Sequence, residues 1–253
     1  MSGAPHLERS GAVATLTLQR PAQRNRLHVE DLQALQSHFA TLAADPAVRV
    51  LVLAATGPVF CAGFNLGELE GGEQAPGPQL FERTVDALEA LPQITVARLH
   101  GGVHGGATDL ALACDFRVGV SAMTLRMPAA RIGLHYYAGG LRRFVHKLGP
   151  GAARRLFLLA EEVPADDLLR IGYLDRLVEA DALDAAVDAI VQSLLAQAPL
   201  ALLGMKASID EIGRGEPDLD RLRRREADCA ASADLREGLA ALAARRAPRF
   251  EGR

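Results

Sequence analysis

The chain has 253 residues, of which 49% are hydrophobic, and its formal net charge is −3 at pH 7. This length allows one large domain with a C-terminal extension, and the nearly balanced charge excludes the strongly basic character of a nucleic-acid-binding protein. The three cysteines lie far apart without the paired spacing of a disulfide framework or a zinc site, which indicates reduced thiols and no bound metal.

The N-terminal residues show no basic segment followed by an apolar run, so they do not resemble a secretory signal. No apolar stretch reaches the length that crosses a membrane. Together with the sparse cysteines, these features predict a cytoplasmic protein that has no membrane partner.

Hydrophobic patterning in the first half of the chain predicts strands that alternate with helices. The alternation over 13–18 and the apolar run over 50–55 are typical of strands, and the second strand is expected to be buried. Segment 67–78 is rich in Gly, Glu and Pro and is expected to be a mobile loop. The other expected elements are helices over 28–44, 79–91 and 106–113 and strands over 94–99, 116–120 and 123–126.

From residue 139 onward the pattern is mostly helical. Strands that alternate with helices and then give way to a helical tail favour stacked βαβ units capped by a helical region. We therefore expect a core over 1–195 and a C-terminal helical region over 196–253. The second region has more apolar positions than one packed face needs, so we expect it to mediate oligomerisation.

Two short segments carry the functional signal. Residues 58–66 read PVFCAGFNL and residues 100–109 read HGGVHGGATD. Each follows strand-like residues and places small residues where a turn meets a helix start, which leaves backbone N–H groups without helical partners. Two such groups aimed at one point would form an oxyanion hole. Taken alone, the glycines of the second segment are also consistent with a simple tight turn.

Together, the two segments resemble the signature segments of the crotonase (enoyl-CoA hydratase/isomerase) superfamily, whose members stabilise thioester enolates. The resemblance implies an α/β fold, a crotonase-like spiral of β-β-α units with a helical C-terminal region. It also implies a homotrimer or homohexamer, an acyl-CoA substrate, and no cofactor besides the coenzyme A of that substrate. Further similar segments, in the family's order and spacing, are 20–25, 133–143, 174–178, 199–208 and 245–253.

The resemblance implies that the backbone N–H groups of Phe64 and Gly106 are the two oxyanion donors. Gly106 stands at the expected start of a helix, where the helix dipole adds positive potential. Asp109 occupies the position of the first hydratase carboxylate and is about one methylene shorter than the usual Glu, which matters in a fixed geometry. The alternative for Asp109 is a purely stabilising role in the first helical turn.

The second carboxylate of the family's hydratases is missing, because Ala129 follows Pro128 at its position and cannot move protons. Many isomerases of the family use an acidic residue further along, and here that position falls on Tyr137. Some decarboxylases of the family carry a tyrosine near this loop, where it can orient a carboxylate or protonate an enolate. Tyr137 is therefore a candidate catalytic residue and Tyr136 a candidate substrate-binding residue, with ordinary pocket lining as the alternative for both.

Further substrate contacts are expected around the glycine turn and the coenzyme A site. His104 flanks the turn, although a lone His in an apolar setting is more often a core residue. Arg24 and Lys206 are candidates to supply positive charge to the phosphates of coenzyme A, with solvated surface charge as the alternative. The residues expected to shape the adenine and thioester channel through main-chain groups are Ala62, Gly63 and Asn65.

The sequence thus predicts an acyl-CoA-processing enzyme of the hydratase/isomerase type, a lyase or an isomerase, that passes through an oxyanion-hole-stabilised thioester enolate. Ala129 disfavours a simple hydratase. An acyl-CoA decarboxylase or hydrolase is an alternative within the superfamily. A catalytically silent acyl-CoA-binding homologue is a further alternative, because the same two segments would serve binding alone.

Overall fold

The structure is a computed structural model that describes residues 3–69 and 76–253. Its main sheet has six strands in the order β1-β2-β3-β4-β6-β9. The edge strand β1 is antiparallel to β2, and the other neighbours are parallel. The strands of this sheet are β1 (His6–Ser10), β2 (Val13–Leu18), β3 (Val50–Ala55), β4 (Ile94–Leu99), β6 (Phe116–Val120) and β9 (Arg176–Val178).

A second, smaller sheet lies beside the glycine-rich segment. It has three strands in the order β5-β7-β8, with β5 parallel to β7 and β7 antiparallel to β8. Because β5 leads directly into α3, this sheet fixes the position at which that helix begins. Its strands are β5 (Val103–His104), β7 (Thr124–Arg126) and β8 (Val163–Pro164).

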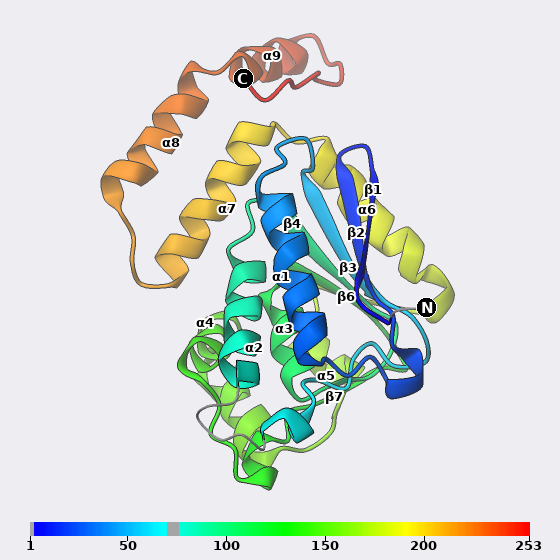
Figure 1. Ribbon diagram of the computed structural model, residues 1–253. Helices are drawn as coiled ribbons and strands as arrows, with labels where there is room; N and C mark the ends of the chain where they lie inside the picture. Colours follow the sequence, from blue (N-terminus) through cyan, green and yellow to red (C-terminus); the bar gives the residue numbers. More distant parts are fainter. Residues whose placement is uncertain (1–2, 70–75) are drawn as a thin grey trace.

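Helices cover both faces of the main sheet. In Figure 1, α1 and α2 lie side by side in front of the strands, and α6 packs behind them against β3, β4 and β6. All six residues of β3 are buried between these layers, as its continuous apolar run predicts. The helices up to this point of the chain are α1 (Val29–Ala43), α2 (Pro76–Glu89), α3 (Gly106–Ala113), α4 (Ala138–Arg154), α5 (Ala165–Arg170) and α6 (Leu183–Leu195).

Parts of the first half differ from the sequence prediction. Strand β1 was not expected, because four of its five residues are exposed at the sheet edge and give no apolar alternation. Helix α2 begins at Pro76 instead of residue 79, since proline is tolerated in the first helical turn. The expected mobile loop over 67–78 is partly a short 3₁₀-helix, η2 (Leu66–Leu69), and partly α2, and its residues 70–75 lie outside the described part of the chain.

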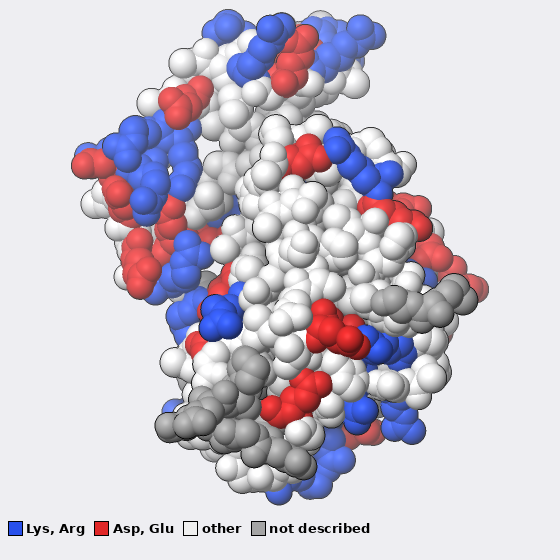
Figure 2. Space-filling view, in the orientation of Figure 1, with Lys and Arg blue, Asp and Glu red and all other residues white. Residues whose placement is uncertain are grey.

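The C-terminal part consists of α7 (Pro199–Gly213), α8 (Leu219–Ala231) and α9 (Ala233–Ala243). Figure 1 shows α8 and α9 extending away from the sheet, and α8 has no buried residue. Figure 2 shows basic and acidic side chains next to each other along α8, with a broad uncharged area in the middle of the same face. The predicted α/β class with a helical C-terminal region is confirmed.

Within the described residues, no single helix combines the length and apolar character needed to cross a membrane. The helical segment 180–195 and α7 pass that test only when they are taken together, and the chain bends by 107° between them. Cys61, Cys114 and Cys229 are free thiols, the first two of them buried.

Candidate active site

A cavity of about 360 Å³ lies at the end of the molecule where the two glycine-containing segments meet. It is lined by residues around Phe64, by the first turns of α2 and α3, and by the segment between 127 and 137. Most of this lining is apolar, and the volume lies in the range of small-molecule binding sites. The sequence segments that predicted a function therefore form one concave site.

Phe64 and Gly106 both line this cavity. Gly63 has a φ of +90°, and a Cβ atom on it would lie 2.8 Å from the Gly106 nitrogen, so the two segments touch closely only because this residue is a glycine. Leu27 N–H donates to Gly63 O, and Asn65 N–H donates to Leu27 O. In this parallel bridge the N–H of the residue between them, Phe64, points away from Leu27.

Neither the Phe64 N–H nor the Gly106 N–H donates a hydrogen bond to any described residue. Gly106 is the first residue of α3, and the preceding Gly105 provides no side-chain cap. A Cβ atom on Gly106 would lie 2.7 Å from Cζ of Phe81, so a side chain here would collide with α2. Two unpartnered amides at the wall of an apolar cavity, one of them at a helix N-terminus, can stabilise an anion.

Asp109 lies behind the wall of the cavity and is fully buried. Its Oδ1 accepts a hydrogen bond of 2.7 Å from Nη1 of Arg143. Its Oδ2 accepts hydrogen bonds from the hydroxyl groups of Tyr136, at 3.2 Å, and Tyr137. The two tyrosines line the cavity and separate Asp109 from it. The structure thus brings all three predicted residues together, but only the tyrosines face the cavity.

Arg143 connects this cluster to α2. Its side chain is fully buried and also pairs with Glu89, at 2.9 Å, and Asp86, at 2.7 Å. Burial alone would lower the pKa of Arg143, but the Asp109 and Glu89 carboxylates outweigh that effect and raise it. The Asp109 side chain is therefore held by one guanidinium and two phenols. The catalytic role of Asp109 stays a prediction, and in this geometry it would act through Tyr137, which lines the cavity.

The two tyrosines are held in their neutral form. Burial raises the pKa of Tyr136 and of Tyr137, and the facing Asp109 carboxylate raises both further. Their rings stack, with centroids 4.6 Å apart, and Phe81 meets Tyr137 edge-on at 6.1 Å. Ala129 also lines the cavity, so the second hydratase position offers no proton-transfer group there.

The remaining predicted contacts fall into two groups. His104 and Ala62 line the cavity, and burial lowers the pKa of His104, which keeps the imidazole neutral near pH 7. Arg24 is exposed, and its carbonyl accepts the Ala62 N–H at 2.9 Å, which places it beside the cavity segment. Asn65 instead holds the η2 turn, because its Oδ1 accepts the Gly67 N–H and its Nδ2 donates to Glu68.

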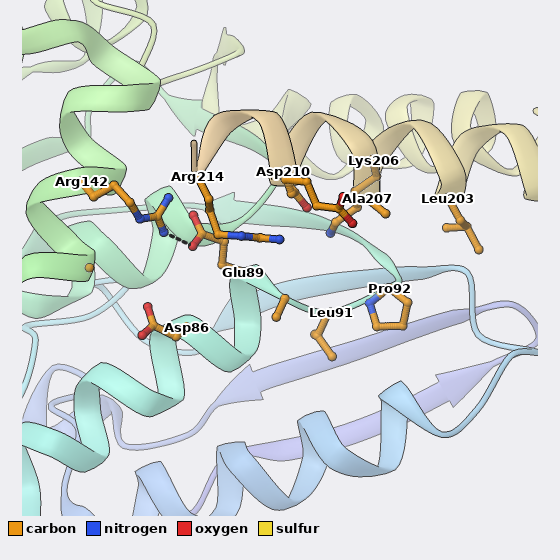
Figure 3. Close-up of a pocket in the computed structure, with 13 residues that line it drawn as sticks. Asp86, Glu89, Leu91, Pro92, Arg142, Leu203, Lys206, Ala207, Asp210 and Arg214 are labelled. Carbon is orange, nitrogen blue, oxygen red and sulfur yellow. Dashed lines mark hydrogen bonds and ion pairs between the residues drawn. The ribbon is translucent and has the colours of Figure 1, made fainter. Parts of the chain in front are cut away.

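Lys206 lies at a different hollow, of about 510 Å³, between α2, α4 and α7 (Figure 3). Its Nζ donates to Gln93 O at 2.7 Å and to Asp115 Oδ2 at 2.5 Å. Figure 3 also shows Glu89 paired with Arg142 in this hollow, so charges of both signs face it. The structure does not bring Lys206 to the cavity of Phe64 and Gly106, and its charge is already paired. The prediction that it binds coenzyme A therefore has no support in this geometry.

Two residues of the site were not singled out from the sequence. Glu82 lies within the predicted helix 79–91, but the sequence does not show which side of that helix faces the glycine segments. Arg143 belongs to a segment that was noted only for its resemblance. The usable signal for Arg143 was its place among apolar residues, because a buried guanidinium requires acidic partners. In the described part of the chain, no group of three or more His, Cys, Asp or Glu could hold a metal ion.

Comparison with known proteins identifies the family. The family model for enoyl-CoA hydratase/isomerase matches residues 8–253. The chain is 29% identical to a crotonyl-CoA hydratase from Syntrophomonas wolfei, over 96% of each protein. It is 32% identical to the human enoyl-CoA hydratase domain-containing protein 2, over 95% of this chain and 86% of that protein.

Solved structures show the same fold. An enoyl-CoA hydratase/carnithine racemase from Magnetospirillum magneticum matches with a TM-score of 0.91 and 30% identity, over 99% of this chain and 96% of that one. An enoyl-CoA hydratase from Bacillus anthracis matches with a TM-score of 0.89 and 25% identity, over 98% of this chain and 99% of that one. The predicted crotonase-like fold is confirmed by these matches.

Proposed function

Because the chain belongs to the enoyl-CoA hydratase/isomerase family, we propose that it binds an acyl-CoA thioester and stabilises its enolate between the N–H groups of Phe64 and Gly106. When a proton leaves the α-carbon of a thioester, negative charge develops on the carbonyl oxygen. Two preorganised donors stabilise that charge without reorganising at the moment of reaction. The observation that supports this proposal is the pair of unpartnered amides in one apolar cavity.

The coenzyme A part of the substrate enters beside residues 24–26 and 62–65. Arg24 supplies positive charge to the phosphates, and main-chain groups of Ala62, Gly63 and Asn65 shape the channel of the thioester and adenine. His104 contacts the acyl part as a neutral side chain. No cofactor besides the substrate's own coenzyme A takes part in this proposal.

Isomerisation is favoured over simple hydration within this proposal. Hydration benefits from two carboxylates that hold one water molecule. Here Ala129 replaces one of them, and Asp109 is bound to Arg143 and two phenols. Among the described residues that line the cavity there is no Lys or Arg, so a malonyl-type carboxylate would be buried without a cation. That argues against the decarboxylase alternative.

A panel of crotonyl-, 3-enoyl- and malonyl-type CoA thioesters tests the reaction class. We expect turnover of the 3-enoyl thioester and little turnover of the malonyl type. Tight binding of all three without turnover of any would favour the catalytically silent binder. Fast hydration of crotonyl-CoA would contradict the preference for isomerisation.

Gly106→Pro tests the oxyanion hole directly, because proline lacks the N–H group and is tolerated at the first position of a helix. We expect kcat to fall by about 10²–10³-fold, the usual contribution of one oxyanion donor, with little change in coenzyme A binding. Gly106→Ala is the matched control, since it adds the same contact with Phe81 but keeps the N–H. Equal losses in both variants would show that the amide is not the donor.

We further propose that copies of the chain form a homotrimer, which can pair as a homohexamer, in the cytoplasm. Support comes from the C-terminal helices, which expose apolar side chains that this chain does not cover. The most exposed of them on α7 and α9 are Met205, Ile209, Ile212, Leu235, Leu239 and Leu242.

A further inference from the structure

We propose that Glu82 of α2 is the proton-transfer residue of the cavity and acts on the acyl carbons of an uncharged enoyl thioester. The inference rests on the proposed acyl-CoA function. It assigns to Glu82 the task that neither Asp109 nor Ala129 can perform in this geometry.

Glu82 differs from Asp86 and Glu89 in having no partner among residues 3–69 and 76–253. It lines the cavity, and among the described residues that do so it is the only carboxylate. No hydrogen bond or ion pair joins its side chain to any described residue, whereas Asp86 and Glu89 on the same helix both bind Arg143. A half-buried carboxylate without a partner, facing an apolar cavity, is free to bind a proton from a ligand.

Helix α2 holds Glu82 close to the two amide donors. The preceding residue, Phe81, lies against Gly106, and its ring centroid is 5.9 Å from that of Phe64. Pro78 and Glu82 are four residues apart and therefore share one face of α2, and both line the cavity. The carboxylate and the donors thus belong to one small space, as proton abstraction next to a stabilised carbonyl requires.

The other titratable groups of the cavity wall are less suited to this task. Tyr136 and Tyr137 already donate their hydroxyl hydrogens to Asp109. His104 is neutral and lies beside Gly102, where a Cβ atom would be 2.5 Å from its Nε2. His135 is exposed, and its Nδ1 bonds the Tyr136 carbonyl at 2.9 Å. Glu82 is therefore the group best placed to take and return a proton.

A single carboxylate completes a double-bond shift. An oxygen of Glu82 takes a proton from the α-carbon of a 3-enoyl thioester, and the C–H electron pair forms a double bond between the α-carbon and the carbonyl carbon. The carbonyl π electrons move to oxygen, where the Phe64 and Gly106 N–H groups stabilise them. The protonated Glu82 then gives its proton to the γ-carbon, which yields the conjugated 2-enoyl thioester. No water, oxidant or second carboxylate is consumed.

Glu82→Gln tests the inference because it keeps the shape and removes the base. With a 3-enoyl-CoA in D₂O, we expect both kcat and deuterium incorporation at the acyl carbons to fall by about 10²–10⁴-fold, the usual contribution of one positioned acid or base. The dissociation constant of butyryl-CoA should stay unchanged, because that ligand needs no proton transfer to bind. Added formate should restore part of the activity of Glu82→Ala by supplying the missing carboxylate.

Glu162→Gln is the matched control. Glu162 is an exposed carboxylate close enough to raise the pKa of His104, yet it does not line the cavity. Its variant should keep the wild-type rate, whereas an equal loss in both variants would overturn the inference. Wild-type turnover that survives Glu82→Gln would overturn the role of Glu82 and leave the proposed function intact. A wild-type protein that neither binds nor turns over any acyl-CoA would instead refute the proposed function.

Discussion

At the scale of single residues, the main difference between sequence and structure concerns Asp109. Its position in the chain matches a family carboxylate, and that match predicts proton transfer. In the structure, Arg143 and the two tyrosines bind its oxygens. The short Asp side chain keeps the carboxylate behind the tyrosines. We assign proton transfer to Glu82 instead, a residue that only the packing of α2 could identify.

Asp109→Asn is expected to lower the free energy of unfolding by about 3 kcal/mol, because it removes the charge from a fully buried ion pair. Urea unfolding of purified protein measures this change. Activity should fall as well, since Tyr137 loses the partner that orients it.

Glu30→Gln is the control for Asp109→Asn, because Glu30 pairs with Arg20 while its side chain is 67% exposed. Glu30→Gln should lower the free energy of unfolding by about 1 kcal/mol or less. An Asp109→Asn protein of normal stability that loses activity by about 10²-fold or more would return Asp109 to a direct part in proton transfer.

At the scale of elements, α4 and α3 are joined by a cation at a helix end. Lys147 of α4 donates from Nζ to Leu112 O at 2.7 Å and to Cys114 O at 3.1 Å, at the C-terminus of α3. A positive charge is favoured at that end of a helix. Burial and the nearby Arg117 nevertheless lower the pKa of Lys147 to about 8. The contact between the two helices therefore depends on pH.

Lys147→Met is expected to change how stability depends on pH. Between pH 8 and about 10, the unfolded chain keeps this lysine protonated while the folded chain releases the proton, so its contribution to stability rises with pH. The free energy of unfolding of wild type minus that of Lys147→Met should therefore increase across this window. Buried Cys61, whose pKa burial raises to about 12, acts in the opposite direction but equally in both proteins. If the difference between the two free energies of unfolding stayed constant across this window, the prediction would be contradicted.

At the scale of the whole molecule, the sequence predicted most of the fold because the buried strands have strong patterns. The apolar run of β3 predicts a buried strand and the glycine turn predicts the start of α3, and both are confirmed. Strand β1 escaped prediction, since an exposed edge strand has no apolar alternation to detect. The expectation for Phe64 and Gly106 rested on main-chain groups and local sequence, and the structure places both residues at one cavity. Glu82 was not singled out, and Lys206 was expected near the other site residues although it lines a different hollow. The surroundings of both residues depend on how distant helices pack, which local patterns do not contain.

The C-terminal helices predict that copies of the chain assemble with one another. Met205, Ile209 and Ile212 repeat at helical spacing on α7 and are 57–63% exposed, and α8 buries nothing within this chain. An uncovered apolar stripe of this kind is typical of a subunit interface. We therefore expect light scattering at micromolar concentration to give three or six times the chain mass of 26.9 kDa.

Ile209→Asp should reduce that mass, because it places a charge in the middle of the α7 stripe without touching the core. Leu158→Asp is the matched control, since Leu158 is 70% exposed and lies outside residues 196–253. It should leave the mass of the assembly unchanged. A wild-type protein that scatters as a 26.9 kDa monomer would contradict the assembly, and equal dissociation of both variants would contradict the assignment of the interface to the C-terminal helices.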